Sequence, residues 1–170
     1  GTLKNGITYL KVRSEYLEAW GLEKDDVLHE ALLNSYRILP PRIYDFKKMM
    51  YTPGYAGEDF LNMDPYFISD KKKKEGICLS VKGLSNGAVA VLYPGVIKKL
   101  VEFMDGGFYV VFSSVHEALI YSSKLCSLEE LENLLRTSNA RMTFQKEFLT
   151  DKVYYYCKEE DKFIMLRGSM

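Results

Sequence analysis

The residue types best suited to catalysis gather in the segment Ser113-Ser114-Val115-His116-Glu117, within the stretch FYVVFSSVHEALIY. A serine hydroxyl becomes a nucleophile when a histidine within hydrogen-bond reach takes its proton and a carboxylate orients that histidine. This segment holds all three residue types within five positions. It therefore raises the hypothesis of a small hydrolase that uses Ser113, Ser114, His116 and Glu117.

The spacing within this segment favours a structural turn over a catalytic site. In an extended chain Ser114 and His116 share a strand face with their Cβ atoms about 6–7 Å apart, and Glu117 points the other way. The Gly-x-Ser-x-Gly elbow of many serine hydrolases is absent from the sequence. Serine hydroxyls commonly accept hydrogen bonds from local backbone amides in turns. We therefore expect no catalytic residues and a turn held by His116, with the hydrolase as the alternative.

Metal and cofactor chemistry has little support in the sequence. His29 and His116 are the two histidines of the chain, so a histidine-rich metal centre is impossible. The acidic stretches EKDD (23–26) and KEEDK (158–162) lack the alternating oxygen ligands of a calcium loop. The stretch LSNGAVAVLYPGV (84–96) lacks the pattern of a phosphate-binding loop. We expect no metal and no cofactor.

The segment from residue 42 to residue 68 is the candidate binding surface. It is rich in aromatic and methionine side chains, which suit adaptable binding surfaces and equally suit a cluster that covers one end of a sheet. Both interpretations remain open. The candidate residues are Tyr44, Phe46, Met49, Met50, Tyr51, Tyr55 and Tyr66.

Composition limits the classes of function. Of the 170 residues 47% are hydrophobic and 27% are charged, as in an ordinary globular protein, and we expect one α+β domain over residues 1–170. Basic and acidic residues number 23 each, which argues against nucleic-acid binding, because that activity usually needs a basic excess. The longest apolar run, 88–93, is far too short to cross a bilayer. Three widely separated cysteines indicate reduced thiols and a cytoplasmic location.

Hydrophobic periodicity and turn residues predict the elements that must position these side chains. Helices are expected over 14–20, with Ser14 as N-cap and Gly21 at the end, and over 23–39, with one apolar face that packs on the protein. Further helices are expected over 94–107 and over 127–139, where Ser127 and Glu130 have capping-box spacing. Strands are expected over 5–12, 108–112 and 117–122, and hairpins over 77–93 and 152–166.

The region 42–75 is harder to read. It is expected to be largely irregular, with helical turns near 43–50 and 57–63 and a mobile tip at Lys71–Lys74. Hairpins dominate over strand–helix–strand alternation elsewhere. The predicted class is therefore α+β, a mostly antiparallel sheet of about six or seven strands with helices packed on one face.

Several of these pieces occur together in a known order: LEAWGLEKDDVLHEALLNSYRILPP, NGAVAVLYPGV, GGFYVVFSSVHEALI and SNARMTFQKEFLTDKVYYY. In this combination the chain resembles a family of uncharacterised proteins from Clostridia-type, largely gut-dwelling bacteria. The resemblance implies a domain of unknown function, without catalytic residues to transfer, and a further N-terminal region upstream of this chain. Where that family usually has proline before the Ser-Ser pair, this chain has Phe112.

Together these observations predict a non-catalytic cytoplasmic interaction module. Its expected partner is another protein or its own upstream N-terminal region, with no role at nucleic acid or membrane. The sequence leaves the oligomeric state open.

Overall fold

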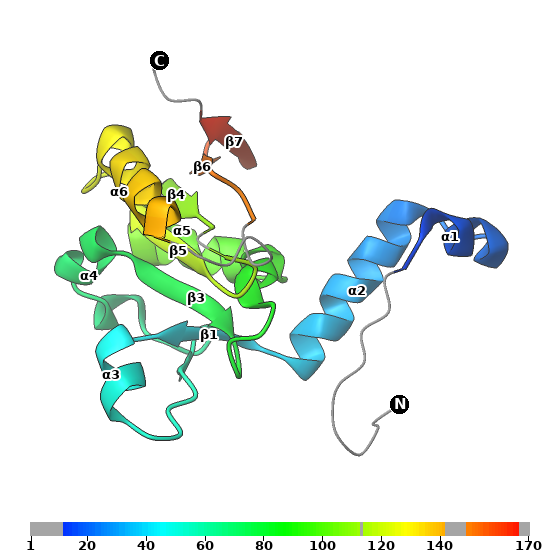
Figure 1. The fold of residues 1–170 in the computed structure, drawn as a ribbon, viewed down its shortest axis with the longest axis horizontal. Helices are drawn as coiled ribbons and strands as arrows, with labels where there is room; N and C mark the ends of the chain where they lie inside the picture. Colours follow the sequence, from blue (N-terminus) through cyan, green and yellow to red (C-terminus); the bar gives the residue numbers. More distant parts are fainter. Residues whose placement is uncertain (1–11, 113, 142–148, 167–170) are drawn as a thin grey trace.

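A single seven-stranded antiparallel sheet organises the molecule (Figure 1). The computed structural model describes residues 12–112, 114–141 and 149–166. The strand order is β2-β1-β3-β5-β4-β6-β7. The strands are β1 (Pro41–Tyr44), β2 (Glu58–Asp59), β3 (Ile77–Val81), β4 (Phe108–Val111), β5 (Ala118–Ser122), β6 (Val153–Cys157) and β7 (Lys162–Leu166). The predicted α+β class with a mostly antiparallel sheet is confirmed.

One face of the sheet carries the main core. Along β4 and β5 alternate residues such as Phe108, Val110 and Ile120 point to this face and are fully buried. They share one core cluster with residues of α5 (Val96–Met104) and η2 (Gly87–Leu92), and η1 (Pro65–Phe67) contacts α5. α5 forms within the helix predicted over 94–107, and it buries Leu100 and Phe103 in this core. This layer is the predicted helical covering of one face.

A smaller cluster lies on the opposite face, over β4, β5 and β6. It contains Val111, Tyr121 and Val153, which alternate with the residues of the main core, and the helix α6 (Leu128–Arg141) covers it with Leu131 and Leu135. The predicted capping box begins this helix: the Ser127 amide donates to Glu130 at 2.8 Å, and the Glu130 amide donates to the Ser127 hydroxyl at 3.3 Å. The capping box therefore locates the start of α6 correctly.

The N-terminal helices α1 (Ser14–Trp20) and α2 (Lys24–Ile38) form an arm that leads away from the sheet (Figure 1). Gly21 ends α1 with a left-handed φ of 63°, as predicted, but the N-cap is Arg13, so Ser14 is already within the helix. No residue of either helix is buried. Among the described residues of the two helices, Leu32 and Tyr36 pack partly against the core. The predicted packing face of α2 is thus mostly exposed. The strand expected over 5–12 lies outside the described residues, apart from Val12.

The hairpin predicted over 77–93 is wrong in its second half. β3 forms as expected, and Asn86 has the positive φ of a turn residue, but residues 87–92 form the 3-10 helix η2 instead of a strand. The amides of Gly87 and Ala88 donate to the carbonyls of His116 and Val115 instead of to β3. A Cβ on Gly87 would lie 2.0 Å from the Ser80 hydroxyl, so only glycine allows this close approach.

The aromatic region after β1 consists of short elements. These are α3 (Phe46–Tyr51), β2, η1 and α4 (Asp70–Glu75), of which α3 matches the helical turn predicted near 43–50. Lys71–Lys74 lies within α4, whose N-cap is Ser69, and the Ser69 hydroxyl accepts from the amide of Lys72. β1 pairs with β3 from Pro41 to Tyr44 and was not predicted, because its four residues show no strand pattern of their own.

Candidate functional site

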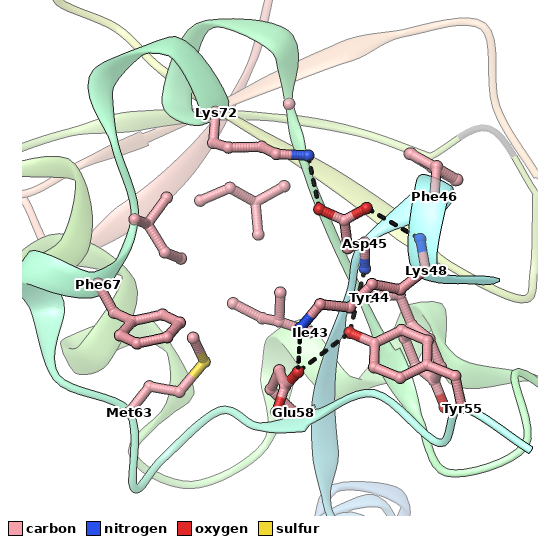
Figure 2. Close-up of a pocket in the computed structure, with 13 residues that line it drawn as sticks. Ile43, Tyr44, Asp45, Phe46, Lys48, Tyr55, Glu58, Met63, Phe67 and Lys72 are labelled. Atoms are coloured by element: carbon pink, nitrogen blue, oxygen red, sulfur yellow. Dashed lines mark hydrogen bonds and ion pairs between the residues drawn. The ribbon is translucent and has the colours of Figure 1, made fainter. Parts of the chain in front are cut away.

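A pocket of about 140 Å³ opens between β1, α3, η1 and α4 (Figure 2). Its floor is apolar and includes Ile43, Ile68 and Ile77, which are all buried. Figure 2 shows Met63 and Phe67 on one side of the pocket and Asp45 with Phe46 across from them. An aromatic side chain at the mouth, Phe67, is 76% exposed, so apolar surface extends from the floor to the solvent.

Charged side chains form one rim of this pocket. Lys72 of α4 contacts Asp45 with 2.8 Å between Nζ and Oδ2, and Lys48 of α3 contacts Glu58 with 2.9 Å between Nζ and Oε1. The Tyr55 hydroxyl joins the two pairs, because it donates to Glu58 at 3.5 Å and accepts from the Asp45 amide at 3.4 Å. The rim is therefore charged but internally paired.

Asp45 has two tasks at this rim. As the N-cap of α3, its Oδ1 accepts from the amides of Lys47 at 2.9 Å and Lys48 at 3.2 Å, while Oδ2 contacts Lys72. The hydrogen bond from Lys72, followed by the amide of Lys48, holds the pKa of Asp45 below its usual range. Asp45 is thus a stable anion that fixes α3 against α4, and such a carboxylate is not poised to take up a proton.

Three of the candidate binding residues line the pocket: Tyr44, Phe46 and Tyr55. Tyr44 is buried, and its hydroxyl donates to the Val81 carbonyl at 2.9 Å and accepts from the Gly83 amide at 3.3 Å. Tyr55 packs edge-on against it with ring centroids 5.9 Å apart. Burial is the largest cause of the raised pKa of both phenols. These two tyrosines therefore build the wall, while Phe46 is half exposed at the edge.

The other candidates lie outside the pocket lining, on the surface around it. Met50, Tyr51 and Tyr66 are well exposed, Tyr66 at 95%, and Met49 is partly exposed. Sequence reasoning missed the lining residues Asp45, Met63, Phe67 and Lys72. Of these, Asp45 had a readable signal, since aspartate directly before a short helical stretch is a typical N-cap.

The segment that resembled a hydrolase site lies between β4 and β5, on another part of the molecule. Ser113 lies outside the described residues. The Ser114 hydroxyl is buried and accepts from the backbone amide of His116 at 3.0 Å. The Nδ1 atom of His116 accepts from the amide of Asn86 at 3.1 Å, and the His116 carbonyl accepts from Ser80 at 2.6 Å.

These contacts give the segment a structural task. The Ser114 hydroxyl and the His116 imidazole both accept hydrogen bonds from backbone amides. The bond from the Asn86 amide to His116, together with the backbone bonds from Gly87 and Ala88, joins the β4–β5 connection to the turn before η2. The contact between Ser114 and His116 joins the serine hydroxyl to the backbone amide of the histidine, and not to its ring. A nucleophile–base pair requires the hydroxyl to donate to the ring, and this contact has a different geometry.

Among residues 12–112, 114–141 and 149–166, no group of three or more histidine, cysteine, aspartate or glutamate side chains is arranged to hold a metal ion. In the same part of the chain no helix combines the length and apolarity needed to span a bilayer.

Comparison with curated proteins gives no match, and comparison with solved structures gives none either. A family model does match. It covers residues 2–158, far more than half of the chain, and its description is a family of unknown function (DUF5688). The chain therefore belongs to this family of unknown function.

Proposed function

We propose that the protein is a non-catalytic interaction module whose pocket receives one apolar side chain of a protein partner. The size of the pocket carries this proposal. Sites for whole small molecules usually enclose about 300–1,000 Å³, whereas a cavity of about 150 Å³ accommodates a single benzene ring. At about 140 Å³, with an apolar floor, the pocket matches one leucine or phenylalanine side chain.

The surroundings of the pocket support a protein partner. Protein interfaces combine a buried apolar anchor with aromatic and methionine residues around it. Here Phe46, Met50, Tyr51, Tyr66 and Phe67 are all at least half exposed on the elements that surround the pocket. The half-exposed ion pair of Lys48 and Glu58 lies at the rim of the pocket. There it offers hydrogen-bond partners for the backbone of a bound chain.

The partner is another protein, and an upstream region of the same polypeptide is the alternative. We also propose a cytoplasmic location, in support of which Cys78, Cys126 and Cys157 are all free thiols. The hydrolase alternative is weakened by two contacts, because the Ser114 hydroxyl accepts from the His116 amide and His116 Nδ1 accepts from the Asn86 amide.

A selection from random displayed peptides tests the proposal. Peptides selected on the protein are expected to share one essential apolar position and to lose most of their affinity when that position becomes alanine. Phe67→Glu places a charge at the mouth of the pocket and should weaken binding by at least about tenfold.

Tyr66→Glu is the matched control, because Tyr66 is adjacent, is 95% exposed and does not line the pocket. It should change the affinity no more than about twofold. Peptides that need no apolar position, or that bind the Phe67→Glu variant as well as the parent, would refute the pocket as the binding site. A synthetic peptide of the upstream region, tested in the same assay, distinguishes the two kinds of partner.

A further inference from the structure

The outer face of α2 is exposed and lies apart from the residues that line the pocket. α2 has 15 residues and buries none of them. Among the described residues its contacts with the core lie on one side, where Leu32 packs partly on the core and the Tyr36 ring lies edge-on to Tyr93 with centroids 6.1 Å apart. Helices of this length are marginal in water unless an apolar face is covered. In the part of the chain that the structure describes, the opposite side of α2 packs against no part of the core.

The uncovered side has the spacing of a coiled-coil seam. Val27, Ala31, Asn34 and Ile38 follow one another at intervals of four, three and four residues, which corresponds to alternating core positions of two heptads. Ile38 is 76% exposed. A groove of about 340 Å³ runs along the same face, with Leu22, Val27 and Ala31 as its apolar lining and Asp26, Glu30 and Asn34 as its polar lining.

The charges beside this seam are complementary to a second copy of α2 in the opposite direction. Glu30 and Arg37 are seven residues apart, so they occupy equivalent positions on the same flank of the seam with opposite charges. If two copies pack antiparallel, Glu30 of each faces Arg37 of the other, and this ion pair occurs twice. In the same register Val27 lies opposite Ile38, and Ala31 lies opposite Asn34. In a parallel pair Glu30 would instead lie opposite Ser35 of the second copy, so these ion pairs would not form.

We infer that two copies of this chain associate through an antiparallel contact between their α2 helices. The interface is isologous, so each copy contributes the same surface. Small Ala31 at the centre allows the helices to approach closely, and Asn34 beside it fixes the register, as single polar core residues do in coiled coils. This surface is distinct from the pocket, so the Phe67→Glu variant should leave the association unchanged.

Sedimentation velocity over a range of protein concentrations tests this inference on the complete 170-residue chain. The parent should pass from monomer to dimer as the concentration rises. Ala31→Glu places charges at the centre of the seam and should abolish the dimer. Arg37→Glu and Glu30→Arg should each raise the dissociation constant roughly tenfold, because each turns two attractive pairs into repulsive ones.

The double variant Glu30→Arg/Arg37→Glu restores opposite charges across the antiparallel interface and should recover dimerisation. His29→Glu is the matched control, because His29 is exposed and lies on the side of α2 opposite the seam. A parent that stays monomeric at all concentrations overturns the inference, as does a dimer that persists in Ala31→Glu. Failure of the double variant to recover association would overturn the antiparallel register.

Discussion

At the scale of single residues, Ser114 and His116 show how chemically capable side chains serve the backbone. The buried Ser114 hydroxyl binds the amide of His116, and the ring of His116 binds the amide of Asn86. An unpaired buried amide is costly, so the Ser114 hydroxyl, which binds a partly buried amide, contributes to stability, and the His116 ring ties the exposed Asn86 turn to this connection. Residue types and spacing indicated a possible triad, but the direction of the hydrogen bonds could not be read from the sequence.

Ser114→Ala should lower the free energy of unfolding by about 1–2 kcal/mol, because it removes the acceptor of a partly buried amide. Urea unfolding followed by circular dichroism measures this change. The exposed Ser85→Ala is the control and should stay within about 0.5 kcal/mol of the parent. An equal effect of the two substitutions would show that the Ser114 contact does not stabilise the fold.

Cys78 makes stability depend on pH in the alkaline range. Burial, with the nearby charge of Glu117 as a second cause, raises the pKa of its thiol to about 12. The unfolded chain releases this proton near pH 9, so the thiol's contribution is complete below that pH and is lost as the pH rises toward 12. Stability should therefore fall with increasing pH.

Between about pH 8.5 and pH 10 the parent should lose roughly 1 kcal/mol more stability than Cys78→Ala does. Urea titrations at the two pH values measure the free energy of unfolding of each protein. The two proteins are compared by how much this free energy changes with pH, because the smaller side chain alters the absolute stability as well. Cys157→Ala serves as the control, because Cys157 is only partly buried. It should retain the pH dependence of the parent. Identical pH dependence in Cys78→Ala and the parent would contradict the assignment.

At the scale of elements, structure that depends on nearby residues was predictable. The turn at Gly21, the capping box of α6 and the strand pair β6–β7 all follow from local signals. Elements that depend on distant partners were not. β1 is a strand because β3 pairs with it, and residues 87–92 become helical because the carbonyls of Val115 and His116 take the amides of Gly87 and Ala88.

The capping box gives a test at this scale. Ser127→Ala removes the acceptor of the Glu130 amide and should destabilise the protein by about 1 kcal/mol. Glu130→Gln keeps an oxygen for the Ser127 amide and should cost less than about half of that. Chemical unfolding of both variants against the parent measures the difference. If Glu130→Gln costs as much as Ser127→Ala, the carboxylate charge rather than the box geometry supports the start of α6.

At the scale of the whole molecule, the pocket and the arm both arise from tertiary arrangement. The pocket forms where β1, α3, η1, α4 and the start of β3 converge, and sequence reasoning identified its aromatic content without the charged rim or the isoleucine floor. The periodicity of α2 predicted a helix with an apolar face, but only the structure shows that this face is mostly exposed. Periodicity specifies which residues share a face, and it does not specify what covers them.

The most direct test of the pocket is methyl NMR of the isoleucine side chains during titration with a selected peptide. Binding of an apolar side chain in the pocket should shift the methyl signals of Ile43, Ile68 and Ile77 and leave those of Ile97 and Ile164 unchanged. A peptide whose apolar position is alanine should produce none of these shifts. Shifts confined to Ile97 or Ile164, or no shift of the three pocket isoleucines on binding, would contradict the proposed site.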